Sequence, residues 1–444
     1  MESDAFPEVD WDEVPLSELT SANVTYGVVQ PGSPVSDGVP MIRVKNFNSH
    51  TLNLNEVIRI SHDVERKYER TRVRAGDVLI TVVGSVGQVA IVPPELTGWN
   101  IARAVALIRP KSPDLARWIA YFLRSPIAQH RMGIAANTTV QTTVNLKDLR
   151  TMPIPMPPET VRQGITDLLS ALDDRIDLLR QTSTTLEAIA QALFKSWFVD
   201  FDPVYAKSEG RDPEAMDAAT AALFPSKFEP SELGLIPKGW HVDEIGNAVK
   251  CLGGGTPSTK EDAYWRDGEF HWVTPKDLSG LQAPVLITTD RKITSAGLSR
   301  ISSGLLPVGT LLMSSRAPIG YLALTSIPTA INQGFIAMPP GGTLPPIYLF
   351  FWARINMDLI KQSANGSTFM EISKKAFRPI KLCIPPPELV DAFVAIASPL
   401  MSRIEANEHH RVTLAELRDT LLPRLISGKL RLPDVEPASL VVET

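Results

Sequence analysis

The chain has 444 residues, of which 44% are hydrophobic and 21% charged, and its formal net charge is −5. At about 150 residues per domain, this length predicts roughly three units, and the composition excludes a disordered chain. Cys251 and Cys383 are its only cysteines, which excludes a disulfide framework or a cysteine-built zinc site and favours a cytoplasmic location. No run approaches the about 18 apolar residues of a membrane span, and the acidic start does not resemble a signal peptide.

The negative charge is concentrated at the two ends of the chain. Residues 1–13, an expected acidic tail, carry six acidic and no basic residues, and residues 433–444 carry three acids and no base. Taking these nine charges from −5 leaves residues 14–432 with a net charge of +4. A mildly basic body permits binding of a polyanion such as DNA, and an ordinary solvated surface explains it equally well.

The chain contains an internal repeat of about 230 residues. Three segments of different character recur at nearly constant offsets of 233, 229 and 228 residues. The aligned segments are 76–90 with 309–323, 154–159 with 383–388, and 185–194 with 413–422. Two large copies, rather than a solenoid of short repeats, follow from this spacing.

Each copy begins with a β-rich part, over residues 14–158 and 240–386. Short β-branched runs separated by Gly and Pro predict strands, and residues 115–123 and 347–360 predict helices. The sequence therefore predicts two globular α/β domains. Each ends in a proline cluster that is typical of the start of a helix.

Long helices are predicted over residues 159–201 and 387–428. In the first, apolar residues recur in steps of three and four from Val161 to Trp197, as in a coiled-coil seam. At about 1.5 Å per residue, a helix of about 38 residues is about 57 Å long. We expect the two helices to pair with each other; the alternative is that each packs only on its own domain.

The second helix departs from the repeat at two kinds of position. Asn407 and Arg411 interrupt its apolar seam, at the positions that the repeat equates with Leu179 and Ser183. The prolines at positions 399 and 423 are expected to bend or end the helix locally.

The remaining segments are interpreted as connections. Residues 202–239 mix Pro, Gly and charged residues and predict a linker with short helices, and residues 429–444 predict a C-terminal tail. The aromatic cluster before the linker is interpreted as a packed helix end rather than a ligand cage. Its members are Phe194, Trp197, Phe198 and Phe201.

No segment has the pattern of an active site. Residues 253–260 (GGGTPSTK) lack the spacing of a phosphate-binding loop and predict a glycine-rich turn. Residues 202–205 (DPVY) lack the second proline of the DNA amino-methyltransferase tetrapeptide. No acid pair accompanies a lysine as in a nuclease, and no histidine has metal-ligand spacing. We expect neither catalytic nor metal-binding residues.

Polar and basic segments flank the predicted strands in both domains. Arg, Lys, Asn and Gln read base edges, whereas Ser, Thr and Lys contact phosphates. Each such residue taken alone is more readily explained as a surface or turn residue. Two similar domains joined by a stiff spacer nevertheless predict the reading of two DNA half-sites. The candidates in the first domain are Arg43, Lys45, Asn46, Arg72, Arg74, Ser85, Arg103, Asn137, Thr138, Thr139 and Gln141. The candidates in the second domain are Thr274, Lys276, Ser314, Ser315, Arg316, Asn332, Gln333, Asn365, Ser367 and Thr368.

Several segments resemble the specificity (S, or HsdS) subunits of type I restriction-modification systems. Four resemble their target-recognition domain: residues 253–265, 272–280, 312–324 and 331–335. Three others resemble their helical regions: residues 192–204, 232–240 and 421–430. The resemblance covers nearly the whole chain, in family order. The first domain matches less closely, because the GGTPS and NQGF motifs have no clear counterpart in it.

This resemblance implies an α+β fold, in which two target-recognition domains are joined by two long antiparallel helices in a pseudo-two-fold internal repeat. The domains would read the two parts of an asymmetric, bipartite site in double-stranded DNA. The helices would fix the gap between the parts and dock two methyltransferase (M) subunits, which restriction-translocase (R) subunits join.

The resemblance also implies where the chemistry of the complex lies. S-adenosylmethionine, ATP and Mg²⁺ are implied for the partner subunits, and no cofactor or membrane contact is expected for this chain. The alternatives are a stand-alone sequence-specific DNA-binding regulatory protein and a nuclease with an unrecognised active site.

Overall fold

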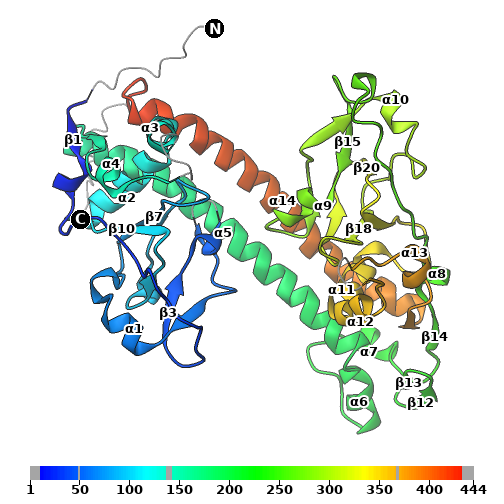
Figure 1. The fold of residues 1–444 in the computed structure, drawn as a ribbon. Helices are drawn as coiled ribbons and strands as arrows, with labels where there is room; N and C mark the ends of the chain where they lie inside the picture. Colours follow the sequence, from blue (N-terminus) through cyan, green and yellow to red (C-terminus); the bar gives the residue numbers. More distant parts are fainter. Residues whose placement is uncertain (1–10, 49–50, 137–142, 367–369, 433–444) are drawn as a thin grey trace, which may run out of the picture. The chain divides into compact units, whose positions relative to one another are not determined.

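The computed structural model describes residues 11–48, 51–136, 143–366 and 370–432 (Figure 1). The chain forms two compact units. Unit 1 comprises Met1–Asp174 and Leu414–Thr444, and unit 2 comprises Arg175–Thr413. The α+β class and the two-domain organisation are thereby confirmed.

A four-stranded antiparallel sheet forms the centre of unit 1. Its order is β2-β10-β7-β8: Thr25–Tyr26, Val105–Ile108, Val78–Thr81 and Val89–Ile91. Strand β7 is buried on both faces, because successive side chains of a strand point to opposite sides. Val78 and Ile80 enter the core beneath helix α2 (Pro113–Arg124), whereas Leu79 enters a second core with Ile101.

A smaller, mixed sheet completes the β-structure of unit 1. Its order is β6-β3-β9: Ile58–Ile60, Val39–Ile42 and Asn100–Ile101. Strand β3 pairs antiparallel with β6 and parallel with β9. The short strands β4 and β5 (Phe47–Asn48 and Thr51–Leu52) form a separate pair. The described short helices are α1 (His62–Arg66), α3 (Pro126–Ala136) and α4 (Leu146–Arg150).

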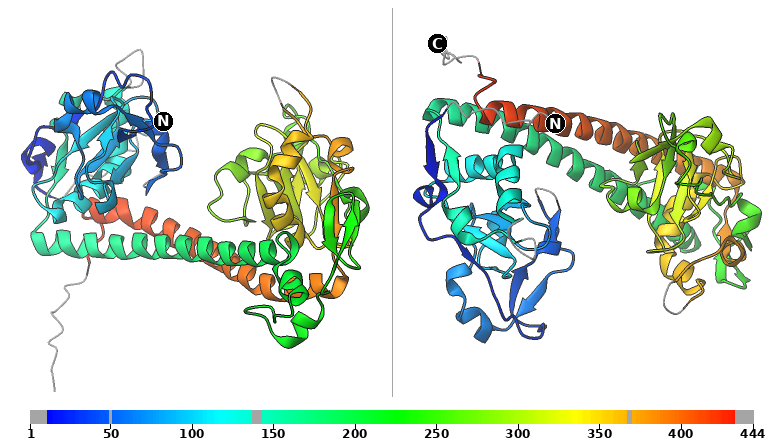
Figure 2. Two further views of the ribbon diagram at one scale, coloured as in Figure 1. Left: turned by 90° about the horizontal axis from the view of Figure 1, so that it is seen from below. Right: turned by 45° about the horizontal axis from the view of Figure 1, so that its top comes forward.

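Unit 2 repeats the core of this arrangement. Its larger sheet has the order β16-β19-β18-β21: Val285–Leu286, Leu322–Thr325, Leu311–Ser314 and Phe335–Met338. Its edge strand β16 pairs parallel with β19, whereas the edge strand β2 of unit 1 pairs antiparallel with β10. Its smaller sheet has the order β17-β15-β20: Arg291–Ile293, Phe270–Val273 and Thr329–Ile331. Helix α11 (Pro346–Ile355) contacts β18 and β19 as α2 contacts β7 and β8 (Figure 2). The internal repeat is therefore a repeat of the fold.

Equivalent strand pairs also link the start of each domain to its last strand. In unit 1, β1 (Glu13–Pro15) pairs antiparallel with β11 (Pro153–Pro155). In unit 2, β14 (His241–Glu244) pairs antiparallel with β22 (Lys381–Ile384). The short helices of the second repeat are α8 (Ile245–Ala248), α9 (Pro275–Ser279), α10 (Ser295–Leu298), α12 (Met357–Gln362) and α13 (Lys374–Phe377).

Two helices of 40 residues each, α5 (Glu159–Phe198) and α14 (Pro387–Ile426), follow these strand pairs. Within unit 2, Phe194 packs on Phe393 with ring centroids 5.4 Å apart. Ser183, earlier on α5, contacts Asn407, later on α14. The two helices are therefore antiparallel, and the predicted pairing is confirmed.

The prolines of α14 do not end it. The prolines are expected from the sequence to bend or end the helix, but it continues through Pro399 and past Pro423 to Ile426, so neither proline ends it at its own position. A proline inside a helix removes one hydrogen bond and costs about 3 kcal/mol. Burial of Phe393, Ile404 and Leu425 along the same helix offsets such a cost.

The segment between the repeats is a packed part of unit 2. It contains α6 (Asp202–Ser208), α7 (Ala218–Ala222) and the hairpin β12–β13 (Phe228–Ser231 and Gly234–Pro237). Phe224 and Ile236 join the core around Phe194, Trp197 and Phe198. The aromatic cluster is thus a packed helix end, as predicted. Among the described residues, no helix is long and apolar enough to cross a membrane.

Candidate nucleic-acid interface

Four backbone hydrogen bonds bring the motif segments of unit 2 together. Gly255 N donates to Ile331 O at 3.0 Å, and Asn332 N donates to Val273 O at 3.0 Å. Ser315 makes the other two bonds: its N donates to Gly334 O at 2.8 Å, and its O accepts from Ile372 N at 3.0 Å. The glycine-rich segment and the ends of β15, β18 and β20 therefore meet. We call the loops that follow these ends the unit 2 loop cluster.

Exposed polar side chains project from this cluster. Thr256 Oγ1 donates to Gln333 Oε1 at 2.6 Å. Lys276 is 83% exposed, and its Nζ lies 3.2 Å from a carboxylate oxygen of Asp290. Arg316 is half-exposed and lies 3.9 Å from Glu371. Such exposed cations can exchange their carboxylate partners for a polyanion.

Other candidates in unit 2 hold the loops in shape. Thr274 caps α9, and its Oγ1 donates to Asp277 Oδ2 at 2.6 Å. Ser314 and Ser315 are buried, and Ser314 Oγ donates to Pro318 O at 2.7 Å. Asn332 Oδ1 accepts from the amide of Gly334 at 2.8 Å. Because these polar atoms are used within the chain, they position the loops.

The same four backbone bonds recur in unit 1, where the loops that they join are called the unit 1 loop cluster. Val28 N donates to Ile101 O at 2.7 Å, Ala102 N to Ile42 O at 2.9 Å, Val82 N to Ala104 O at 2.9 Å, and Val144 N to Val82 O at 3.0 Å. The two motifs without a clear counterpart in the first domain therefore have structural counterparts. These are residues 26–29 for the glycine-rich motif and residues 101–104 for the INQGF segment.

One glycine in each unit makes this packing possible. A Cβ atom on Gly254 would lie 1.8 Å from Ile331 O, and a Cβ atom on Gly27 would lie 1.8 Å from Ile101 O. Only glycine permits such a close approach of backbone. Residues 253–258 have no regular structure and only residues 259–260 form a turn, so the prediction of a glycine-rich turn over 253–260 holds only for its last two residues. No α-helix follows directly, as a phosphate-binding loop requires.

A lysine occupies the same turn in both units. Asn46 Oδ1 accepts from Arg43 N at 2.9 Å, as Asp277 Oδ2 accepts from Thr274 N at 2.7 Å. Lys45 is the third residue of the turn 43–46, as Lys276 is of the turn 274–277, and each lysine pairs with a carboxylate. The Lys45 Nζ lies 2.5 Å from Glu56. The segments VKN (44–46) and PKD (275–277), 231 residues apart, carry a sequence signal for this equivalence.

The other described candidates of unit 1 divide between structural and exposed positions. Asn46 is buried and its Nδ2 donates to Asn53 O at 3.0 Å. Arg72 makes two hydrogen bonds, of 2.8 and 2.7 Å, to the buried carboxylate of Glu65, and these bonds raise the pKa of the Arg72 guanidinium. Arg72 is nevertheless exposed, as are Arg74, Ser85 and Arg103.

Two groups of candidates lie beside or outside the described residues. Asn365 exchanges two backbone hydrogen bonds of 3.0 Å with Glu371. The candidates outside the described residues are Asn137, Thr138, Thr139, Gln141, Ser367 and Thr368. Each unit has an equivalent isolated antiparallel β-bridge beside these candidates: Val83 with Thr143 in unit 1, and Arg316 with Glu371 in unit 2.

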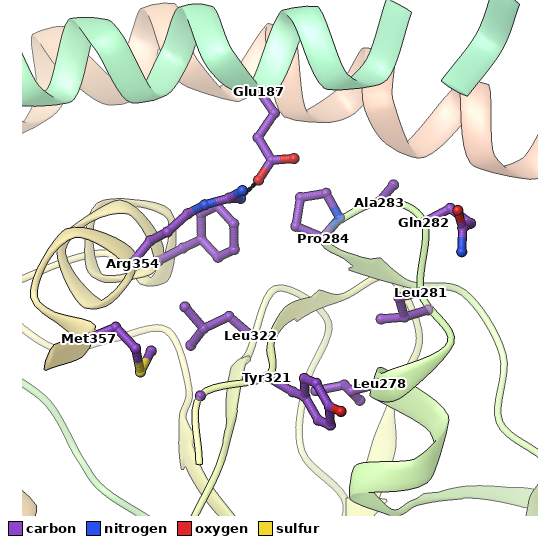
Figure 3. A pocket seen from close by; sticks show the side chains of 12 residues that line it. Glu187, Leu278, Leu281, Gln282, Ala283, Pro284, Tyr321, Leu322, Arg354 and Met357 are labelled. Carbon is purple, nitrogen blue, oxygen red and sulfur yellow. Dashed lines mark ion pairs between the residues drawn. The ribbon is translucent and has the colours of Figure 1, made fainter. Parts of the chain in front are cut away.

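A cavity of about 380 Å³ lies between α5 and the larger sheet of unit 2 (Figure 3). Glu187 of α5 points into it and forms an ion pair with Arg354 of α11. Burial lowers the pKa of Arg354. The rest of the lining, including Pro284, Leu322 and Met357, is largely apolar. Within the described ranges, no group of His, Cys, Asp or Glu is placed to hold a metal ion.

The family model for the type I restriction modification DNA specificity domain matches the chain twice, over residues 8–188 and 237–414. The chain belongs to this family. The two matches follow the repeat, so that each unit contains one specificity domain with one loop cluster. The reading as a type I specificity subunit is thereby supported, and the reading as a stand-alone regulatory protein is not.

Individual relatives are similar over most or half of the chain. The HindI specificity subunit of Haemophilus influenzae is 25% identical over 409 residues, which are 81% of this chain and 87% of the relative. The MjaIX specificity subunit of Methanocaldococcus jannaschii is 32% identical over 194 residues, or 43% of this chain and 45% of the relative. The crystal structure of an S subunit from M. genitalium shares the fold, with a TM-score of 0.53 and 15% identity, over 96% of this chain and 97% of that one.

Proposed function

We propose that this chain is the non-catalytic subunit that reads a bipartite, asymmetric DNA site for a type I restriction-modification complex. The observation that carries the proposal is the shared set of four backbone hydrogen bonds, which assembles one loop cluster in each unit. Two related but non-identical reading surfaces in one chain suit a site with two different halves. Catalysis would belong to other subunits.

The exposed side chains of the loop clusters are the proposed DNA contacts. Lysines 45 and 276, Arg74 and Arg316 would contact phosphates, where a cation adds affinity without sequence information. Arg103 and Gln333 are long enough and polar enough to reach base edges. The buried candidates Asn46, Ser314 and Ser315 would act by holding the loops.

The long helices are the proposed spacer and docking surface. They would fix the gap between the half-sites and bind two methyltransferase subunits, with restriction-translocase subunits joining the complex. S-adenosylmethionine, ATP and Mg²⁺ would be bound by those partners and not by this chain, within the cytoplasm. The antiparallel pairing of α5 with α14 supports this role, because a paired helix keeps a fixed length per residue.

Co-expression with the methyltransferase subunit, followed by genome-wide mapping of methylated adenines, tests the proposal. We expect one recurring bipartite motif with a constant gap. The proposal is wrong if methylation is absent or has no bipartite motif in the presence of an active methyltransferase. As a matched control, replacement of residues 14–152 by the corresponding domain of another specificity subunit should change one half of the motif and leave the other half unchanged.

The nuclease alternative has its own test. Purified chain incubated with Mg²⁺ and plasmid DNA should leave the plasmid intact. Cleavage by the chain without partner subunits would overturn the non-catalytic assignment.

A further inference from the structure

Arg103 stands at the tip of a loop that is fixed on both sides. The residue before it, Ala102, donates its N–H to Ile42 O at 2.9 Å. The residue after it, Ala104, accepts from Val82 N at 2.9 Å. The backbone of Arg103 also donates to Val28 O at 2.9 Å, so its Cα has a defined place while its side chain is exposed.

Gln333 occupies the same position in unit 2. The preceding Asn332 donates its N–H to Val273 O at 3.0 Å, and the following Gly334 accepts from Ser315 N at 2.8 Å. These two bonds are the counterparts of those that flank Arg103. The side chain of Gln333 is likewise exposed.

The two side chains differ in how they are held. The guanidinium of Arg103 has no ion pair or hydrogen bond with any residue that the structure describes. Gln333 Oε1 accepts from Thr256 Oγ1 at 2.6 Å, and its Nε2 has no partner within the described ranges. At the place of Thr256, unit 1 has Val29, which is 46% exposed and cannot donate a hydrogen bond. Gln333 is therefore oriented by its neighbour, whereas Arg103 is not.

The nearby lysines do not differ between the units. Lys45 and Lys276 occupy equivalent turns, and each faces a carboxylate. Residues that are the same in both loop clusters suit the part of DNA that is the same in both half-sites, which is the phosphate backbone. Side chains that differ between the two units at an equivalent, fixed position suit the bases, because the bases are what differ between the two half-sites.

We propose that Arg103 and Gln333 are the position-equivalent base-reading residues of the two units. This proposal rests on the proposed function. An arginine donates two hydrogen bonds to O6 and N7 of guanine, whereas a glutamine pairs with N6 and N7 of adenine. Unit 1 therefore reads a G·C pair with Arg103, and unit 2 reads an A·T pair with Gln333.

The reciprocal substitutions Arg103→Gln and Gln333→Arg test this assignment in the complex with the methyltransferase subunit. The domain replacement described above first assigns each half-site to a unit. We expect Gln333→Arg to change one A·T pair of the unit 2 half-site to G·C, with a preference altered about 5- to 150-fold. Arg103→Gln should produce the opposite change in the unit 1 half-site. In each case the other half-site should remain as it is.

If a variant complex no longer methylates DNA, its base preference is measured instead by competition binding. The complex is titrated with duplexes that differ at one base pair, and Lys276→Ala serves as the matched control. Lys276→Ala should weaken binding to all duplexes equally and reduce the salt slope by about 1. The same uniform loss for Arg103→Ala, or an equal weakening of binding to all duplexes for Gln333→Ala, would overturn base reading in favour of a backbone contact.

Two further outcomes have distinct meanings. Unchanged half-sites and unchanged discrimination in both reciprocal variants would overturn this proposal while leaving the proposed function intact. A wild-type complex without any bipartite motif would instead refute the proposed function itself.

Discussion

Asn407 Nδ2 donates a hydrogen bond to Ser183 Oγ at 3.2 Å, across the buried face between α14 and α5. Asn407 is one of the two residues that interrupt the apolar seam of the second helix. A buried asparagine in a helix pair specifies the register of the helices at a cost in stability, because other registers leave it without a partner. The interruption in the repeat therefore has a structural role.

Asn407→Ala should lower the Tm of unit 2 by about 2–8 °C. The substitution removes the hydrogen bond and leaves a small void, at a cost of about 1–2 kcal/mol. Thermal unfolding followed by circular dichroism measures this shift. Thr184→Ala on the exposed side of α5 is the control, because that hydroxyl bonds only to its own helix. Equal shifts for both variants would show that the buried pair contributes nothing specific.

Asp173 joins the two helices within unit 1. Its carboxylate lies 2.7 Å from Arg418 of α14, 3.4 Å from Arg124 of α2 and 2.9 Å from the hydroxyl of Tyr121. All four groups are largely buried, and burial followed by the charge of Asp173 raises the pKa of Tyr121. One carboxylate thus compensates two arginines that have little access to water.

Asp173→Ala should destabilise unit 1 by about 2–3 kcal/mol, because it removes the carboxylate shared by two largely buried arginines, of which Arg418 keeps the more exposed Asp419 as a counter-charge. Asp177→Ala is the matched control on the same helix. Asp177 pairs with Arg180 at 3.1 Å where both side chains are more exposed, so its loss should cost less than about 0.5 kcal/mol. Denaturant unfolding of both variants gives the comparison, and a cost below 1 kcal/mol for Asp173→Ala would contradict it.

The length of the helices should set the gap between half-sites. Four residues inserted after Leu178 in α5, together with four after Val412 in α14, add about 6 Å, or nearly two base-pair steps of about 3.4 Å. The paired insertion keeps both the Asp173–Arg418 and the Ser183–Asn407 contacts. We expect a longer gap and unchanged half-sites in the methylation map. Altered bases within a half-site would refute the spacer role.

The sequence was sufficient for the features that depend on periodicity. The repeat, the strand of residues 78–81 and both long helices follow from spacing, because burial requires one face to be apolar. The equivalence of Arg103 with Gln333 could not be predicted in this way. It depends on backbone hydrogen bonds that any residue can make, and only Gly27 and Gly254 leave a trace in the sequence.

The sequence also could not predict which polar candidates are buried. Asn46 and Ser314 have the side chains of DNA contacts, yet each bonds to backbone atoms that the fold brings to it. A polar side chain bonds equally well to a backbone or to a ligand, so residue type alone does not separate the two roles.

The stability of unit 2 should decrease at acidic pH because of His271. His271 lies on β15 of the smaller sheet, and its Nδ1 lies 3.0 Å from Thr289 Oγ1. Burial, and secondarily the charge of Lys292, lowers the pKa of His271 below its ordinary value of 6.5. The unfolded chain therefore binds a proton at a higher pH than the folded chain does. The stabilisation is complete above about pH 6.5 and is lost as the pH falls toward the folded-state pKa.

We expect His271→Gln to reduce the fall in the Tm of unit 2 between pH 7 and pH 5, because glutamine does not bind a proton in this range. The measurement is thermal unfolding of wild type and variant at half-unit pH steps. His241→Gln, at an exposed position of β14, is the control for the effect of a His→Gln substitution as such. If His271→Gln and wild type show parallel profiles, neutral His271 does not contribute to the acid sensitivity of the sheet that carries Thr274 and Lys276 at its end.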